Sequence, residues 1–158
     1  MPITRPCTST TAPPSAAVLS AKSRRMRLSM VPPRRLCQAG PAIYCGDWNN
    51  DDQPYPMKVK SGKMFAIPYC NEINDIPLYI RKGYTGEQYL RSVVDQFDAL
   101  YADSRKQPRV MGVPLHPMIS GQPLQIKYLQ RAVAHMKEHQ GVWFATGSEI
   151  IDAYQSAV

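Results

Sequence analysis

The feature that most constrains the fold is an alternation of short apolar stretches and amphipathic helical patterns from residue 41 to the C-terminus. The apolar stretches predict strands, and they read AIYCGDW, GKMFAIPYC, RVMGVPL and VWFA. Two predicted helices start with a capping box, at Thr85 with Gln88 and at Thr146 with Glu149. A third is predicted to begin near Pro123 and to stop at Gly141. This order, β-β-α-β-α-β-α, is typical of an α/β fold with a parallel sheet or barrel.

The N-terminal segment has a different composition from the rest of the chain. Seven of the 19 basic residues lie in residues 1–40, which contain no acidic residue, so the formal charge of +7 belongs to this segment. Its Pro-, Ser- and Arg-rich sequence predicts a disordered tail over residues 1–35 and a folded domain over 36–158. An organellar transit peptide, a basic arm for an anionic partner and a sequence foreign to the fold all fit this tail.

Composition also limits the compartment and the partners. The four cysteines (Cys7, Cys37, Cys45 and Cys70) form no CxxC pair and predict free thiols in a reducing compartment, the cytoplasm. No apolar run reaches the roughly 20 residues of a membrane span, so no membrane partner is expected. Because the basic charge sits in the tail, nucleic acid is not an expected partner of the folded part.

The polar stretch DWNNDDQPY, residues 47–55, is the first candidate site. A calcium-binding EF-hand loop would need Gly at its sixth position and Glu at its twelfth, where this chain has Asp52 and Lys58. Two interpretations remain open. The loop either borders a ligand site at the C-terminal end of a strand, or it is a turn whose side chains bond their own backbone.

The second candidate is His116, which directly follows the apolar stretch RVMGVPL. A histidine at a strand end is well placed for general acid or base chemistry, with Leu115 lining the pocket beside it. A turn histidine held by Pro117 is the alternative. The stretch HMKEH has the H-x-x-E-H spacing of a zinc protease, but an exposed basic helix end is the preferred interpretation.

Four stretches together resemble the polysaccharide deacetylases of the NodB-homology type, in particular their allantoinase-like and peptidoglycan-deacetylase-like branch. These stretches are YCGDWNNDDQPYPM, MFAIPYCNEINDIPLY, GVPLHPMISGQPLQIKYLQRAVAHM and GVWFATGSEIIDAY. The resemblance runs from about residue 36 to residue 155. It implies the C-terminal half of a (β/α) barrel of the polysaccharide-deacetylase type.

The resemblance also implies an activity, which is hydrolysis of a non-peptide C–N amide bond in an N-acetylated saccharide or a small-molecule ureide. His116 matches the family's general acid. Substrate contacts are expected from Asp47, Trp48, Asn50, Asp51, Asp52 and Leu115. Intact family members often bind a divalent metal such as zinc through upstream motifs. The residues before Asp47 contain neither His nor Asp, so no metal ligand, no cofactor and no catalytic base is assigned here.

Two functional hypotheses follow. The first is a piece of a deacetylase-family hydrolase that is inactive alone. The second is a non-catalytic interaction module that pairs with another chain, because the open strand edges of a partial barrel favour association into oligomers.

Overall fold

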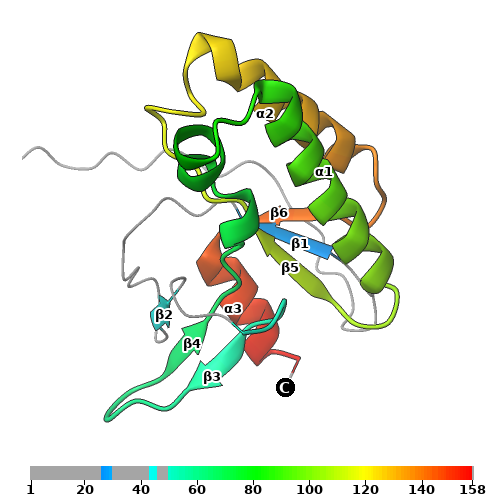
Figure 1. The fold of residues 1–158 in the computed structure, drawn as a ribbon. Helices are drawn as coiled ribbons and strands as arrows, with labels where there is room; N and C mark the ends of the chain where they lie inside the picture. The colour runs from blue at the N-terminus through cyan, green and yellow to red at the C-terminus, as the bar shows by residue number, and fades with distance from the viewer. Residues whose placement is uncertain (1–25, 30–42, 46–49, 158) are drawn as a thin grey trace, which may run out of the picture.

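The structure is a computed structural model that describes residues 26–29, 43–45 and 50–157 (Figure 1). Its strands form two sheets of three. In the first sheet, β1 lies between β5 and β6, and both pairings are parallel. In the second, β4 pairs in parallel with β2 and antiparallel with β3. The strands are β1 (Met26–Ser29), β2 (Ile43–Cys45), β3 (Tyr55–Met57), β4 (Met64–Ala66), β5 (Arg109–Gly112) and β6 (Trp143–Ala145).

Two helices cover one face of the first sheet and a third helix covers the other. α1 (Gly86–Asp103) and α2 (Pro123–Lys137) lie side by side, and α3 (Gly147–Gln155) lies across β5 from them (Figure 1). Two short helical segments, η1 (Asn71–Ile73) and η2 (Ile76–Arg81), connect β4 to α1. Among the helices of the described residues, none is long and apolar enough to span a membrane.

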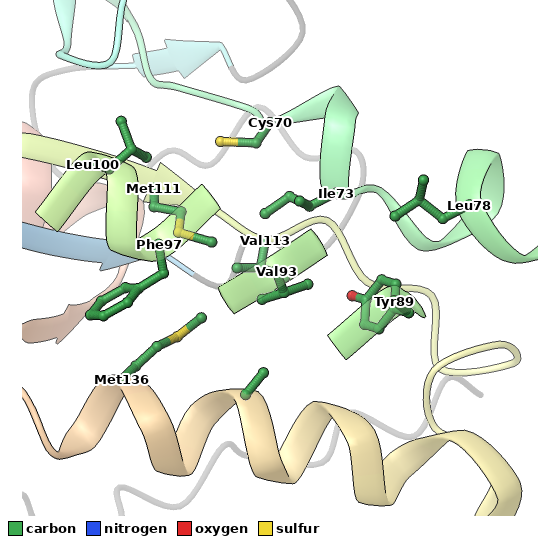
Figure 2. Close-up of a cluster of buried hydrophobic side chains, with 11 residues drawn as sticks. Cys70, Ile73, Leu78, Tyr89, Val93, Phe97, Leu100, Met111, Val113 and Met136 are labelled. Carbon is green, nitrogen blue, oxygen red and sulfur yellow. The ribbon is translucent and has the colours of Figure 1, made fainter. Parts of the chain in front are cut away.

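The buried core is divided by β5. Met111 belongs to a cluster with the inner faces of α1 and α2, including Val93, Phe97 and Met136 (Figure 2). Its neighbour Val110 points the other way, into a smaller cluster with Ile150 and others from β4 and α3. Because successive side chains of a strand face opposite sides, an apolar run of this kind fits a strand buried on both faces.

The predicted helices are confirmed at their starts. Thr85 and Gln88 form a complete capping box, as do Thr146 and Glu149, and α2 begins at Pro123. The predicted end of α2 is wrong by two residues, because Gly141 as the residue after the C-cap would put the C-cap at Gln140, whereas the C-cap is Glu138. Gly141 instead takes a left-handed conformation, with φ of 77°, in the turn that leads into β6.

Two strands were not predicted. β3 contains Pro56, which cannot donate to a ladder, and it occupies an edge of its sheet, where proline is tolerated. β1 lies within the segment predicted to be disordered, so that prediction is wrong for Met26–Ser29. A four-residue strand is too short to show an alternation of apolar and polar residues. The strand forms because its backbone pairs with β5 on one side and with β6 on the other. The rest of residues 1–35 lies outside the described residues, and the domain boundary stays a prediction.

The fold is mixed α/β, as predicted. Both sheets have only three strands among the described residues, so a closed barrel is not part of what the structure describes. The partial barrel therefore stays a prediction.

Candidate functional site

The candidate site is a buried network around the carboxylate of Asp75. The Nδ1 atom of His116 lies 2.6 Å from Asp75 Oδ1, and the His116 backbone N–H donates to Oδ2 over 2.6 Å. The Ser120 hydroxyl also donates to Oδ2, over 2.7 Å. Asp75 is fully buried, whereas the side chain of His116 retains 15% of its exposure. Three donors therefore compensate a carboxylate that has lost its hydration.

Local turns place Asp75 between η1 and η2. The Asn74 side chain accepts a hydrogen bond from the Ile76 backbone over 3.0 Å, which is an Asx turn around Asp75. The Asn74 amide also donates to the Tyr69 hydroxyl over 3.0 Å. The chain direction at Asp75 is thus held by a side chain that is itself buried and bonded.

A tight turn after β5 presents His116 and Ser120 to the same carboxylate. The Ser120 backbone N–H donates to the His116 carbonyl over 3.0 Å, and the Gly121 N–H donates to the Pro117 carbonyl over 3.1 Å. A Cβ atom on Gly121 would collide with that Pro117 oxygen, so the turn requires glycine. These contacts explain why the stretch HPMISG begins with His116 and ends with Ser120 and Gly121.

Burial and the charge of Asp75 raise the pKa values of two tyrosines. Burial, and then the nearby Asp75 carboxylate, raise the pKa of Tyr79 to about 12. The same two causes raise the pKa of Tyr89 above its usual value. The rings of Tyr79 and Tyr89 stack with centroids 4.8 Å apart. The Asp75 carboxylate therefore lies near the rings of these two tyrosines.

This geometry fixes the role of each imidazole nitrogen. An ionised carboxylate only accepts hydrogen bonds, so Nδ1 of His116 donates to Asp75. Nε2 is then the ring nitrogen left to exchange a proton with a ligand. An Asp–His pair of this kind orients the ring and stabilises the imidazolium that forms when Nε2 takes up a proton.

The structure does not bring the described part of the polar loop, residues 50–55, next to His116. The Asp52 carbonyl accepts from the Val110 backbone over 2.8 Å, near the start of β5, whereas His116 follows the end of that strand. Burial raises the pKa of Asp52, and the Arg109 guanidinium opposes this shift. Asn50 and Asp51 are exposed. Asp47 and Trp48 lie outside the described residues, so the substrate role of this loop stays a prediction.

Leu115 directly precedes His116 and is half-buried. Its side chain packs against the larger core cluster. Its expected contact with substrate also stays a prediction.

Comparison with known proteins adds to this geometry. No protein-family model matches the chain. A Schizosaccharomyces pombe protein described as "Putative polysaccharide deacetylase" is 29% identical over 127 residues, and the match covers 73% of this chain and 40% of that protein. A solved structure described as a "probable Polysaccharide deacetylase" from Pseudomonas aeruginosa PAO1 matches with a TM-score of 0.66 and 28% identity. That match covers 72% of this chain and 39% of the other.

The structure of Puue Allantoinase matches with a TM-score of 0.67 and 28% identity, over 72% of this chain and 38% of that one. The relatives of this chain are polysaccharide deacetylases and an allantoinase. The resemblance predicted from the sequence is confirmed. The chain spans about 40% of the length of the curated deacetylase that it matches.

The metal that the deacetylase family implies does not fit the Asp75–His116 network. Both Asp75 oxygens already accept hydrogen bonds, so Nε2 of His116 is the one ligand atom that this network leaves free, and a single ligand does not hold an ion. Within residues 50–157, the one group of three side chains placed to hold an ion lies elsewhere, on α1, on α2 and in the turn after α2. We therefore derive no catalytic step through a metal at His116.

Sequence reasoning identified His116 but did not identify Asp75 or Ser120. Asp75 precedes His116 by 41 residues, and no local spacing reveals a contact of that range. The available signal was an acidic residue in the stretch NEINDIP. This stretch follows β4, and the polar loop follows β2, the parallel neighbour of β4. Ser120 lies four residues after His116, a spacing that one helical turn brings to the same side.

Proposed function

We propose that the chain supplies the proton-donating side of the active site of a hydrolase that cleaves non-peptide C–N amide bonds. The observation that carries the proposal is the contact of 2.6 Å between Asp75 and Nδ1 of His116, which leaves Nε2 for the substrate. The relatives, described as polysaccharide deacetylases and an allantoinase, support the substrate class that we propose. That class is an N-acetylated saccharide or a small ureide.

In the proposed reaction, water adds to the amide carbonyl carbon and the C–N bond breaks. His116 delivers the proton on Nε2 to the departing nitrogen, and Asp75 stabilises the imidazolium before transfer. A separate base must take the proton from the attacking water. Of the two described acids of the polar loop, Asp52 is the half-buried one, but it lies at the other end of β5. We therefore propose that this chain alone is inactive or very weakly active.

A chimera tests the role of His116. The matched segment of the allantoinase would be replaced by residues 36–158 of this chain, and allantoin ring opening would be measured. We expect activity in the chimera and a decrease in kcat of roughly 10²- to 10⁴-fold for His116→Ala. Ser92→Ala is the matched control, because its hydroxyl bonds only within α1. A folded chimera whose rate is unchanged by His116→Ala would contradict the proposal.

The purified chain provides the second test. We expect no measurable hydrolysis of allantoin or of N-acetylated oligosaccharides above the background rate. Hydrolysis that His116→Ala abolishes would show that the chain holds its own base, and would contradict the predicted inactivity.

A non-catalytic interaction module is the second candidate. Among the described residues, β5 and β6 are the edge strands of the parallel sheet, and strand edges can pair with another chain. Size-exclusion chromatography distinguishes the two candidates. A defined oligomer that binds saccharide supports the interaction module. A monomer that binds no saccharide supports the first candidate, in which the chain supplies one side of a hydrolase active site.

We also propose that the protein works in a reducing compartment, the cytoplasm. The cysteine composition supports this proposal, because no CxxC pair occurs and Cys70 is a free, buried thiol.

A further inference from the structure

Three side chains that could ligate a metal converge on the outer side of the α1–α2 pair. Asp98 comes from α1, and His135 and His139 come from the last part of α2 and the turn after it. One potential ligand atom from each lies within 4.8 Å of the others. The two helices run side by side (Figure 1), so the group joins residues that are far apart in the sequence.

One hydrogen bond of the group leaves a ring nitrogen of His139 ready for a metal. His139 Nδ1 lies 2.9 Å from the His135 carbonyl oxygen, so Nδ1 carries the proton and donates it. Nε2 of His139 is then left with a free lone pair. Histidine ligands of metals commonly donate their other nitrogen to a backbone carbonyl in this way. His135 Nε2 lies 2.7 Å from Asp98 Oδ1 and donates its proton to that carboxylate, so an ion that binds both atoms would displace this proton.

Aromatic packing fixes the two imidazole rings. The His139 ring meets Phe97 and Tyr101 edge to face, with centroids 5.0 and 4.8 Å away. His135 also packs edge to face on Phe97, at 5.6 Å. The Tyr101 hydroxyl donates to the Gln140 carbonyl over 3.0 Å, which ties the end of α2 to α1. The two imidazole rings therefore have little rotational freedom left, and binding an ion would cost little side-chain entropy.

The group is also accessible. The side chains of His135 and Asp98 retain 32% and 50% of their exposure. An ion can enter from solvent, and a water molecule can complete its coordination. This position is separate from the Asp75–His116 network, which lies at the opposite end of α1 near Tyr89.

We propose that Asp98, His135 and His139 bind one divalent transition-metal ion of the zinc type and so link α1 to α2. Two imidazoles and a carboxylate favour zinc, cobalt, nickel or copper over calcium and magnesium, which prefer oxygen ligands. In a tetrahedral zinc site, ligand atoms about 2.0–2.2 Å from the ion lie roughly 3.3 Å from one another. The His135–Asp98 pair, at 2.7 Å, must open slightly, which the exposed Asp98 side chain allows, and any pair that is wider than this spacing must close.

The proposal differs from the interpretation of HMKEH as an exposed basic helix end, because Asp98 provides a third ligand from another helix. The proposal also differs from the zinc-protease pattern, because Glu138 is not a member of the group.

Titration of the full chain with cobalt(II) tests the site, using protein without a polyhistidine tag and after treatment with a chelator. We expect saturable binding of one ion per chain, with the visible absorption bands of tetrahedral cobalt. His135→Ala and His139→Ala should each weaken binding at least tenfold, and Asp98→Asn should weaken it less. Glu138→Gln and His116→Ala are controls that should leave the affinity unchanged.

Thermal unfolding with and without zinc provides a second measurement. An ion that binds only the folded state raises the Tm, so zinc should raise the Tm of the wild type but not that of His139→Ala. Circular dichroism establishes that each variant is folded. Absence of saturable binding would show that His135 and Asp98 form an ion pair only. Binding of one ion that the three variants leave unchanged would place the metal elsewhere, and would also overturn the proposal.

Discussion

At the scale of single residues, Asp75 shows what a contact between distant parts of the chain adds to a local pattern. The sequence predicted His116 because it follows an apolar strand, but neither its tautomer nor its orientation could be read from that position. Both depend on a carboxylate 41 residues earlier. Local sequence can therefore identify a reactive side chain, whereas its chemistry depends on partners that only the fold brings near.

Replacing Asp75 tests this network through stability. In Asp75→Asn, one carboxylate oxygen becomes an NH₂ group that must face a donor instead of accepting from it. We expect a loss of about 1–3 kcal/mol in the free energy of unfolding, measured by urea denaturation. Ser120→Ala removes a single donor from the network and should lower stability less. Equal stability of Asp75→Asn and the wild type would show that the carboxylate is not held as described.

Tyr79 predicts a loss of stability in alkali. A tyrosine in the unfolded chain ionises with a pKa of about 10, whereas burial and Asp75 raise the folded pKa of Tyr79 to about 12. Between these values the unfolded state loses its proton first, so the stabilising contribution is complete below about pH 10 and decreases as pH rises toward 12.

The variant Tyr79→Phe should therefore lose less stability than the wild type between about pH 10 and pH 12. Urea midpoints of both proteins, each compared with its own value at neutral pH, give the difference. Tyr89 keeps its raised pKa in the variant, so part of the alkaline effect should remain. Parallel pH profiles of the two proteins would contradict the prediction.

At the scale of elements, the helices were more predictable than the strands. A capping box and a repeating apolar face both lie within the helix that they define, so their signal is local. The strands here have only three or four residues, and their order depends on partners far along the chain. This is why β1 and β3 were not predicted, and why the number of sheets could not be inferred.

The capping box of α1 gives a prediction at this scale. The Thr85 hydroxyl accepts from the Gln88 backbone, and the Gln88 side chain accepts from the Thr85 backbone over 2.8 Å. Thr85→Ala should lower the free energy of unfolding by about 1 kcal/mol. Thr85→Ser keeps the hydroxyl and is the matched control. If the two variants are equally stable, the box does not contribute to the start of α1.

At the scale of the whole molecule, β5 connects two cores. Val110 belongs to the cluster with α3, and Met111 belongs to the cluster with α1 and α2. A strand that supplies adjacent residues to both clusters cannot leave one without disturbing the other. We therefore expect the described part of the chain to unfold in one cooperative step.

Substitutions on either side of β5 test this coupling. Phe97 and Ile150 are fully buried, one in each cluster. Phe97→Ala should destabilise the protein by about 3–5 kcal/mol and Ile150→Ala by about 2–5 kcal/mol. Both should shift a single transition that near-ultraviolet and far-ultraviolet circular dichroism report together. If Ile150→Ala instead separates the unfolding curve into two steps, the clusters fold independently and β5 does not couple them. In that case the Asp75–His116 network, whose two sides meet beyond the end of β5, would depend only on the larger cluster.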